Sequence, residues 1–224
     1  ATLPSRSTTS LMQVAMLRGQ IAPEQVQTLG AQLAEEFPAG DPIMNRELIR
    51  LLVYLQDSSI MDRYFEYLHS DVSNPDKMHV AMYLRFLTAG WTLERKEAWF
   101  EFVTQAKTWD GGSGYPLYLG NAARDFARQL SEDESVEILR QGAAWPDAAL
   151  GALYKLPRDL DDDLREALIH LDEAIDQRKD SASRQLMVGI VAVLARSGDD
   201  ASMAYLRTIW DRNPERREPV AMGL

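Results

Sequence analysis

The spacing of apolar residues most constrains the fold, because they recur three and four positions apart in nearly every segment of the 224-residue chain. The period-two alternation typical of strands is absent. The helical segments fall into pairs joined by short loops, and successive pairs start about 34 residues apart, a period typical of helix-pair repeats. We expect first helices to begin near Ser10, Met44, Asp76, Tyr115, Asp147 and Arg184, with a shortened one near Arg216. The sequence therefore predicts an all-α fold, an α-solenoid of about six antiparallel helix pairs, with a single helical bundle as the alternative.

Local signals place several helix ends. Pro23 fits the first turn of a helix, and the acidic runs 132–134 and 161–163 fit helix starts, where the partial positive charge favours carboxylates. His69 fits the C-terminal end of a helix, where the partial negative charge favours a cationic side chain. The basic segment RNPERRE, residues 212–218, is expected to be an exposed loop between repeats.

Composition excludes several kinds of chemistry. The net charge is -10, which argues against non-specific binding of nucleic acid. The absence of cysteine removes disulfides, thiolate zinc sites, iron–sulfur clusters and c-type haem attachment. No apolar run approaches the roughly 20 residues that span a bilayer. With 46% hydrophobic and 26% charged residues, the composition is typical of a soluble globular protein, and nothing in it predicts a cofactor.

The last residues look like a loop and the first turns of a helix whose apolar face has no neighbour. We therefore expect residues 1–224 to form a single helical-repeat domain that is a fragment of a longer chain. Self-association through Val220 to Leu224 is the other interpretation of this apolar end, and the sequence leaves the oligomeric state open.

Two segments, LSEDESVEILRQG and SGDDASMAYLRTIWDRNPERREPVAMGL, resemble HEAT-type repeats, with two helices around a short Gly/Asp turn. The stretch from YLRFLTAGWT to NAARDFARQL is similar to the repeat segment of large secreted bacterial proteins that carry sugar-dehydrogenase-like or c-type cytochrome modules. This resemblance implies a HEAT-like superhelix, a scaffold role and a periplasmic or secreted location. It does not imply electron transfer, because the chain has no Cys-x-x-Cys-His motif for haem attachment. The matching positions are Trp91, Thr92, Gly111, Gly112, Tyr118, Asn121 and Asp125.

A glycine-rich segment, WDGGSGYPLYLGN at residues 109–121, is the one candidate ligand loop. A phosphate loop needs a preceding strand and a following lysine, whereas here a helix precedes and Tyr115-Pro116 follows. The segment fits a bend between helices, and its second use would be contact with a partner or ligand. Gly120 lies inside the following helix, where it costs about 1 kcal/mol relative to alanine, so we expect another group to approach it closely.

Two hypotheses differ over this region. The scaffold hypothesis puts Gly111 to Gly114 in an open bend with Tyr118 packed between helices. The alternative, a small-ligand site or an enzyme site, predicts a closed pocket with Asn121 or Arg124 pointing inward. The candidate contact residues are Trp109, Gly111, Gly112, Tyr115, Tyr118, Asn121 and Arg124.

The aromatic residues around this loop fit either core packing or exposed recognition. For Trp91, Trp99, Phe100 and Phe102 the helical spacing favours the core, whereas Trp109 and Tyr115 are the best candidates for exposure.

The histidines offer one weak metal signal. His170 lies opposite an apolar stripe, with Glu166 before it and Glu173 after it, which a divalent cation or a solvated salt-bridging face would explain. The second explanation is the more common one, so we predict no metal site; His79 fits a packed histidine.

No nucleophile, metalloprotease motif or catalytic carboxylate pair appears in the sequence. The sequence therefore predicts a non-catalytic helical-repeat scaffold that binds a protein partner or the adjoining modules of its own polypeptide. The alternative is a sugar- or anion-binding protein or an enzyme with a site around residues 109–124.

Overall fold

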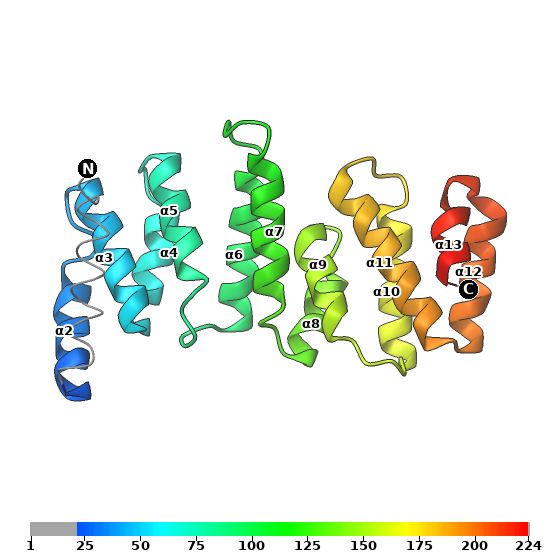
Figure 1. The fold of residues 1–224 in the computed structure, drawn as a ribbon, viewed down its shortest axis with the longest axis horizontal. Helices are drawn as coiled ribbons and strands as arrows, with labels where there is room; N and C mark the ends of the chain where they lie inside the picture. The colour runs from blue at the N-terminus through cyan, green and yellow to red at the C-terminus, as the bar shows by residue number, and fades with distance from the viewer. Residues whose placement is uncertain (1–21, 224) are drawn as a thin grey trace, which may run out of the picture. The chain divides into compact units, whose positions relative to one another are not determined.

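The computed structural model describes residues 22–223. Within that range the chain is all-helical and contains no strand, which confirms the all-α fold (Figure 1). It divides after Thr92 into two compact units, called unit 1 and unit 2 below. The helix expected from Ser10 lies outside the described residues.

Unit 1 holds four described helices and a short 3-10 turn. Helix α3 packs against both α2 and α5, and α4 packs against α5. An aromatic cluster forms part of its core, where Phe37 lies edge-on to Tyr64 with the ring centroids 5.1 Å apart. The elements are α2 (Pro23–Glu35), α3 (Pro42–Leu55), η1 (Ser58–Ile60), α4 (Met61–His69) and α5 (Asn74–Leu84).

Unit 2 holds eight described helices and two 3-10 turns. The buried rings of Trp99, Phe100 and Phe126 form the centre of its first part, with the Trp99 and Phe126 centroids 4.6 Å apart. Core packing is thereby confirmed for Trp99, Phe100 and Phe102. The elements are α6 (Leu93–Ala106), α7 (Tyr115–Ala127), α8 (Glu132–Arg140), α9 (Pro146–Ala152), η2 (Leu153–Lys155), α10 (Asp162–Ile175), α11 (Ser181–Ser197), α12 (Asp200–Arg212), η3 (Pro214–Arg216) and α13 (Arg217–Gly223).

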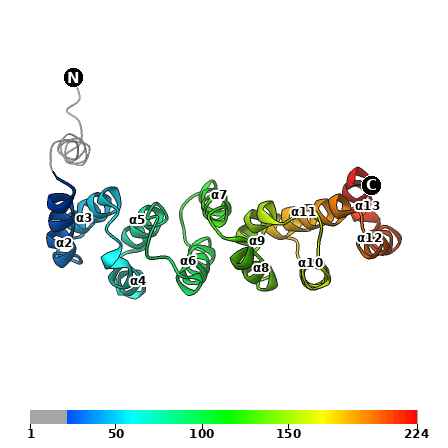
Figure 2. The ribbon, with the colours of Figure 1, turned by 90° about the horizontal axis from the view of Figure 1, so that it is seen from below.

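The helices of unit 2 lie in two rows (Figure 2). Helix α9 packs against α7 and α11, and α11 also packs against α13, so these four helices form one row. Helices α6, α8, α10 and α12 lie along the other side, where α8 packs against α10.

Short-range capping explains where the helices begin. Side chains at the N-cap accept hydrogen bonds from the first-turn amides of six helices, α3, α5, α8, α10, α11 and α12. At α8 the Ser131 and Glu134 side chains form a reciprocal capping box. The acidic runs therefore open helices as predicted, Pro23 opens α2, and His69 ends α4.

Helices α7 and α9 pack closely because glycines face each other's chains. A Cβ at Gly120 would lie 2.7 Å from the Asp147 Oδ1 atom of α9. A Cβ at Gly151 would lie 2.6 Å from the backbone oxygen of Arg124. The close approach expected at Gly120 is thus confirmed, and Asp147 is the group that approaches it.

Candidate functional site

The glycine-rich loop joins α6 to α7 and turns through a backbone conformation that favours glycine. Gly112 has a φ of +81°, and its carbonyl accepts a hydrogen bond from the Tyr115 amide. A Cβ at Gly111 would collide with the Tyr115 ring, 2.3 Å away. Gly111, Gly112 and Gly114 are exposed, so the loop is an open bend.

The exposure of one aromatic residue of this region, Tyr118, differs from what the scaffold hypothesis predicts. Tyr118 is 51% exposed, so the expectation that it packs between helices is wrong. The outer side of α7 carries Leu117, Tyr118 and Asn121, and nothing in unit 2 covers Leu117, which is 61% exposed. Trp109 and Tyr115 are only half-buried, because the Trp109 ring packs edge-on against Phe102 and Tyr115 covers Gly111.

Arg124 belongs to a network of ion pairs and hydrogen bonds that joins three helices. Its guanidinium donates to the Gln185 side chain at 2.6 Å and to the Asn121 side chain, and it lies 3.7 Å from Asp147. Asp147 is 7% exposed and receives a hydrogen bond of 2.6 Å from Lys107 Nζ. Because a buried carboxylate must be paired, this network holds the start of α9 between α7 and α11.

The seven predicted contact residues therefore do not form one site. Asn121 and Arg124 come together in the ion-pair network, Tyr118 lies on the exposed side of α7, and the other four lie at the loop. Two cavities of unit 2 are lined by residues that follow Ser131 rather than by residues 109–124.

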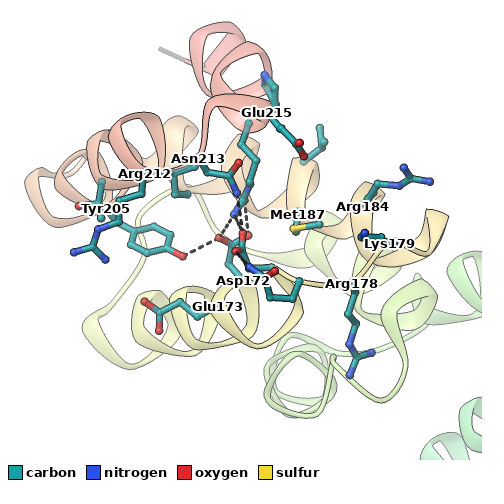
Figure 3. Close-up of a pocket in the computed structure, with 17 residues that line it drawn as sticks. Asp172, Glu173, Arg178, Lys179, Arg184, Met187, Tyr205, Arg212, Asn213 and Glu215 are labelled. Carbon is teal, nitrogen blue, oxygen red and sulfur yellow. Dashed lines mark hydrogen bonds and ion pairs between the residues drawn. The ribbon is translucent and has the colours of Figure 1, made fainter.

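The larger cavity, of about 900 Å³, is one that the sequence did not indicate (Figure 3). It lies among α10, α11, α12 and the turn that leads into α13, and Arg216 reaches into it from that turn. The Arg216 guanidinium donates two hydrogen bonds, of 2.7 and 2.8 Å, to the fully buried carboxylate of Asp172. Tyr205 donates its hydroxyl to the same carboxylate at 2.8 Å, and Asp176 pairs with Arg216 at 3.2 Å.

Burial and these contacts fix the protonation of the cluster. Burial raises the pKa of the Tyr205 phenol, and the neighbouring Asp172 carboxylate raises it further. For Arg216, burial lowers the pKa, but the hydrogen bonds and charge of Asp172 outweigh burial and leave the pKa raised. Arg216 therefore stays a cation and Tyr205 stays a hydrogen-bond donor at neutral pH.

The prediction that residues 212–218 form an exposed loop is wrong, because they end α12, form η3 and begin α13, and the Arg216 side chain is 11% exposed. The ion pair with Asp172, 44 residues earlier, draws it inward. One signal for this pair exists in the sequence, because Asp172 follows Leu168 by four residues and so lies among the apolar residues of α10. An acidic residue in that position needs a buried partner.

The three residues considered for a metal lie on different sides of α10. Glu166 and His170 line the second cavity, of about 500 Å³, with Asp163 and Arg140, whereas Glu173 lines the larger one. Within residues 22–223, no group of three histidine, aspartate or glutamate side chains is placed to hold a metal ion. His79 is half-buried and packs against Tyr83, with the two ring centroids 4.8 Å apart.

Comparisons of the chain with protein-family models, with curated proteins and with solved structures found no match. Among the described residues, no helix is both long and apolar enough to cross a membrane.

Proposed function

We propose that this protein is a non-catalytic helical-repeat scaffold that binds another protein, as one module of a larger bacterial polypeptide. In this proposal the helix pairs stack as a HEAT-like α-solenoid, each pair burying the apolar face of the next. The stacked first helices of the pairs, which are α7, α9, α11 and α13 in unit 2, present a continuous surface. Binding to that surface, rather than any chemical step, is the proposed activity.

Contacts between near neighbours along the chain support the solenoid. Within unit 1 helix α3 packs on α5, and within unit 2 α7 packs on α9, α9 on α11 and α11 on α13, so these helices pack on the next but one along the chain. Side-chain hydrogen bonds between helices mostly join residues 30 to 44 positions apart, such as Arg46 with Asp76 and Arg216 with Asp172. Repeat proteins have this short-range pattern because each unit contacts only its neighbours. The starts of α3, α5, α7, α9, α11 and α13 also fall within three residues of the predicted starts.

One observation carries the binding proposal: large apolar side chains lie uncovered on the row formed by α7, η2 and α11. We call this set the α7–α11 surface; its members are Leu117, Tyr118, Tyr154 and Val188, each more than half exposed. Two contacts indicate that the three elements face the same way, because Arg124 beside Asn121 reaches Gln185, and Arg128 stacks over the Tyr154 ring at 5.2 Å. Exposed apolar and tyrosine side chains grouped in this way are typical of protein interfaces.

Purification from the native cells tests the proposal. The tagged full-length protein is purified after cross-linking, and its partners are identified and then titrated against the purified chain. We expect the double variant Leu117→Ser, Tyr118→Ser to weaken partner binding by about tenfold or more, because such anchors dominate interface energies. Trp210→Ser is the matched control, since it removes a half-exposed aromatic from α12 in the other row. Equal binding by the double variant and the wild type would contradict the proposal.

The alternative function is a sugar- or anion-binding protein or an enzyme with its site around residues 109–124. The half-exposed rings of Trp109 and Tyr115 beside the open loop favour it, because such rings serve as sugar platforms. A thermal-shift screen against sugars, phosphates and nucleotides distinguishes the two functions. A shift that Trp109→Ala abolishes would support the alternative.

A further inference from the structure

The larger cavity of unit 2 differs in charge from the rest of the chain. Four cationic side chains other than Arg216 line it, although the chain as a whole carries a net charge of -10. The carboxylates of Asp172 and Asp176 are occupied by Arg216 and by the hydrogen bonds of Tyr205 and Asn213. Only two other carboxylates line the cavity, so its available charge is positive. The four cations are Arg178, Lys179, Arg184 and Arg212, and the two carboxylates are Glu173 and Glu215.

None of these four cations has an ion-pair partner among the described residues. Arg178 differs from Lys179, Arg184 and Arg212 only in that its side chain donates a hydrogen bond to the backbone oxygen of Ala143. In the view of Figure 3, Lys179, Arg184 and Met187 lie on the opposite side of the cavity from Tyr205. Lys96, by contrast, is paired with Glu134 at 2.7 Å.

The cavity also has an apolar wall and a fixed polar end. Met187 and Ile209 form buried parts of this wall, and Val188 belongs both to it and to the α7–α11 surface. At the other end, Arg216 is held by its hydrogen bond to Asp172. A volume of about 900 Å³ is far larger than a single ion needs and fits a segment of several residues.

We propose that this cavity binds an acidic peptide segment of the partner, with its carboxylates at Lys179 and Arg184 and an apolar side chain against Met187. The inference rests on the proposed function, since it adds to the α7–α11 surface the pocket that receives part of the same partner. Val188 connects the two, because a chain that crosses it passes from the exposed surface into the cavity. The charges of Lys179 and Arg184 select glutamate or aspartate over lysine at that point.

A fluorescent peptide of alternating glutamate and leucine tests this proposal by anisotropy titration against the full chain. Two further peptides, with glutamine or lysine in place of glutamate, measure the part that charge plays. We expect the glutamate peptide to bind at least about tenfold more tightly than either, and its affinity to fall with salt because the contacts are exposed. The double variant Lys179→Gln, Arg184→Gln should bind the glutamate peptide with about tenfold lower affinity than the wild type.

Arg207→Gln is the matched control, because Arg207 is an exposed arginine of α12 outside the cavity. It should leave the affinity unchanged, and circular dichroism confirms that all variants are folded. The proposal is overturned if no binding occurs up to about 1 mM peptide, if the three peptides bind equally, or if the double variant matches the control. Partner purification separates this failure from that of the proposed function. A partner whose binding is lost with Leu117→Ser, Tyr118→Ser but not with Lys179→Gln, Arg184→Gln supports the scaffold function and overturns the proposal that the cavity binds an acidic peptide.

Discussion

Gly120 and Gly151 allow α7 and α9 to approach one another more closely than larger residues would permit. At Gly151 the obstructing atom is the backbone oxygen of Arg124, which cannot move without displacing α7. At Gly120 the obstructing group is the Asp147 side chain, which could rotate but would then lose Lys107. The two glycines therefore differ in how much an added methyl group costs.

We predict that Gly151→Ala lowers the free energy of unfolding by about 1–3 kcal/mol, through steric overlap with the backbone of α7. Gly120→Ala should cost less, because the Asp147 side chain that obstructs it can rotate, whereas the gain in helix propensity of about 1 kcal/mol applies at both positions. The control is Gly114→Ala, where no heavy atom lies within 4 Å and φ is -85°, so the change should stay within about 0.5 kcal/mol. Urea unfolding followed by circular dichroism ranks the three; equal midpoints for Gly151→Ala and Gly114→Ala would contradict the prediction.

Individual helices depend on their N-caps, and α12 has the most strongly bound one. Burial raises the pKa of Asp199, but hydrogen bonds from the Ser202 amide and hydroxyl and from Ser197, together with the charge of Arg165, outweigh burial and leave the pKa well below its usual range. A carboxyl whose pKa is lowered by folding stabilises the protein above its unfolded pKa, near 3.9, and loses that contribution as the pH falls toward its folded pKa.

We predict that Asp199→Asn, which keeps a good N-cap but removes the charge, lowers the unfolding free energy at pH 7 by about 1–2 kcal/mol. The difference from wild type should shrink as the pH falls below about 4, because the wild-type carboxyl then loses its advantage. Unfolding curves at pH 7 and near pH 3 measure it, with the exposed neighbour Asp200→Asn as control. A difference that stays constant on acidification would exclude this role for Asp199.

The helix starts could be predicted from the sequence because their causes are local. Prolines, serines and aspartates at the caps act within three residues, so the starts of α7 and α9 differ by no more than one residue from those expected. Burial of Trp99 and Phe100 followed from helical spacing for the same reason.

The site was less predictable, because exposure depends on which neighbour each helix meets. Tyr118 shares a helix with the buried Phe126, and spacing alone did not show which face of α7 its neighbours would cover. The ion pair of Arg216 with Asp172 joins residues 44 positions apart, and only the acidic residue among the leucines of α10 hinted at it. The resemblance to HEAT repeats stays a prediction.

At the scale of the whole molecule, contacts between near neighbours should confine the effect of a substitution. Arg216→Ala leaves the Asp172 carboxylate buried without its cation, which costs about 3–5 kcal/mol in comparable ion pairs. We predict faster amide exchange in α10, α12 and α13, where the contacts of Arg216 lie, and unchanged exchange in α2 to α5, because the proposed repeat arrangement would confine the loss of structure to neighbouring helices.

Hydrogen exchange measured by mass spectrometry resolves these segments, with Arg207→Ala as a control that removes an exposed arginine from α12. If protection instead falls equally in α2 to α5, the described chain unfolds as one cooperative body and the stacked-repeat arrangement is wrong.

The short distance along the chain between hydrogen-bonded helices also has a consequence during synthesis. Lys96 meets Glu134 after 38 residues and Asp172 meets Arg216 after 44. At about 5–20 residues per second, a ribosome supplies each such partner within roughly two to nine seconds. Two such helices can therefore begin to pack while translation continues. The apolar face of a newly made helix is then exposed for only seconds before the helix that covers it is synthesised.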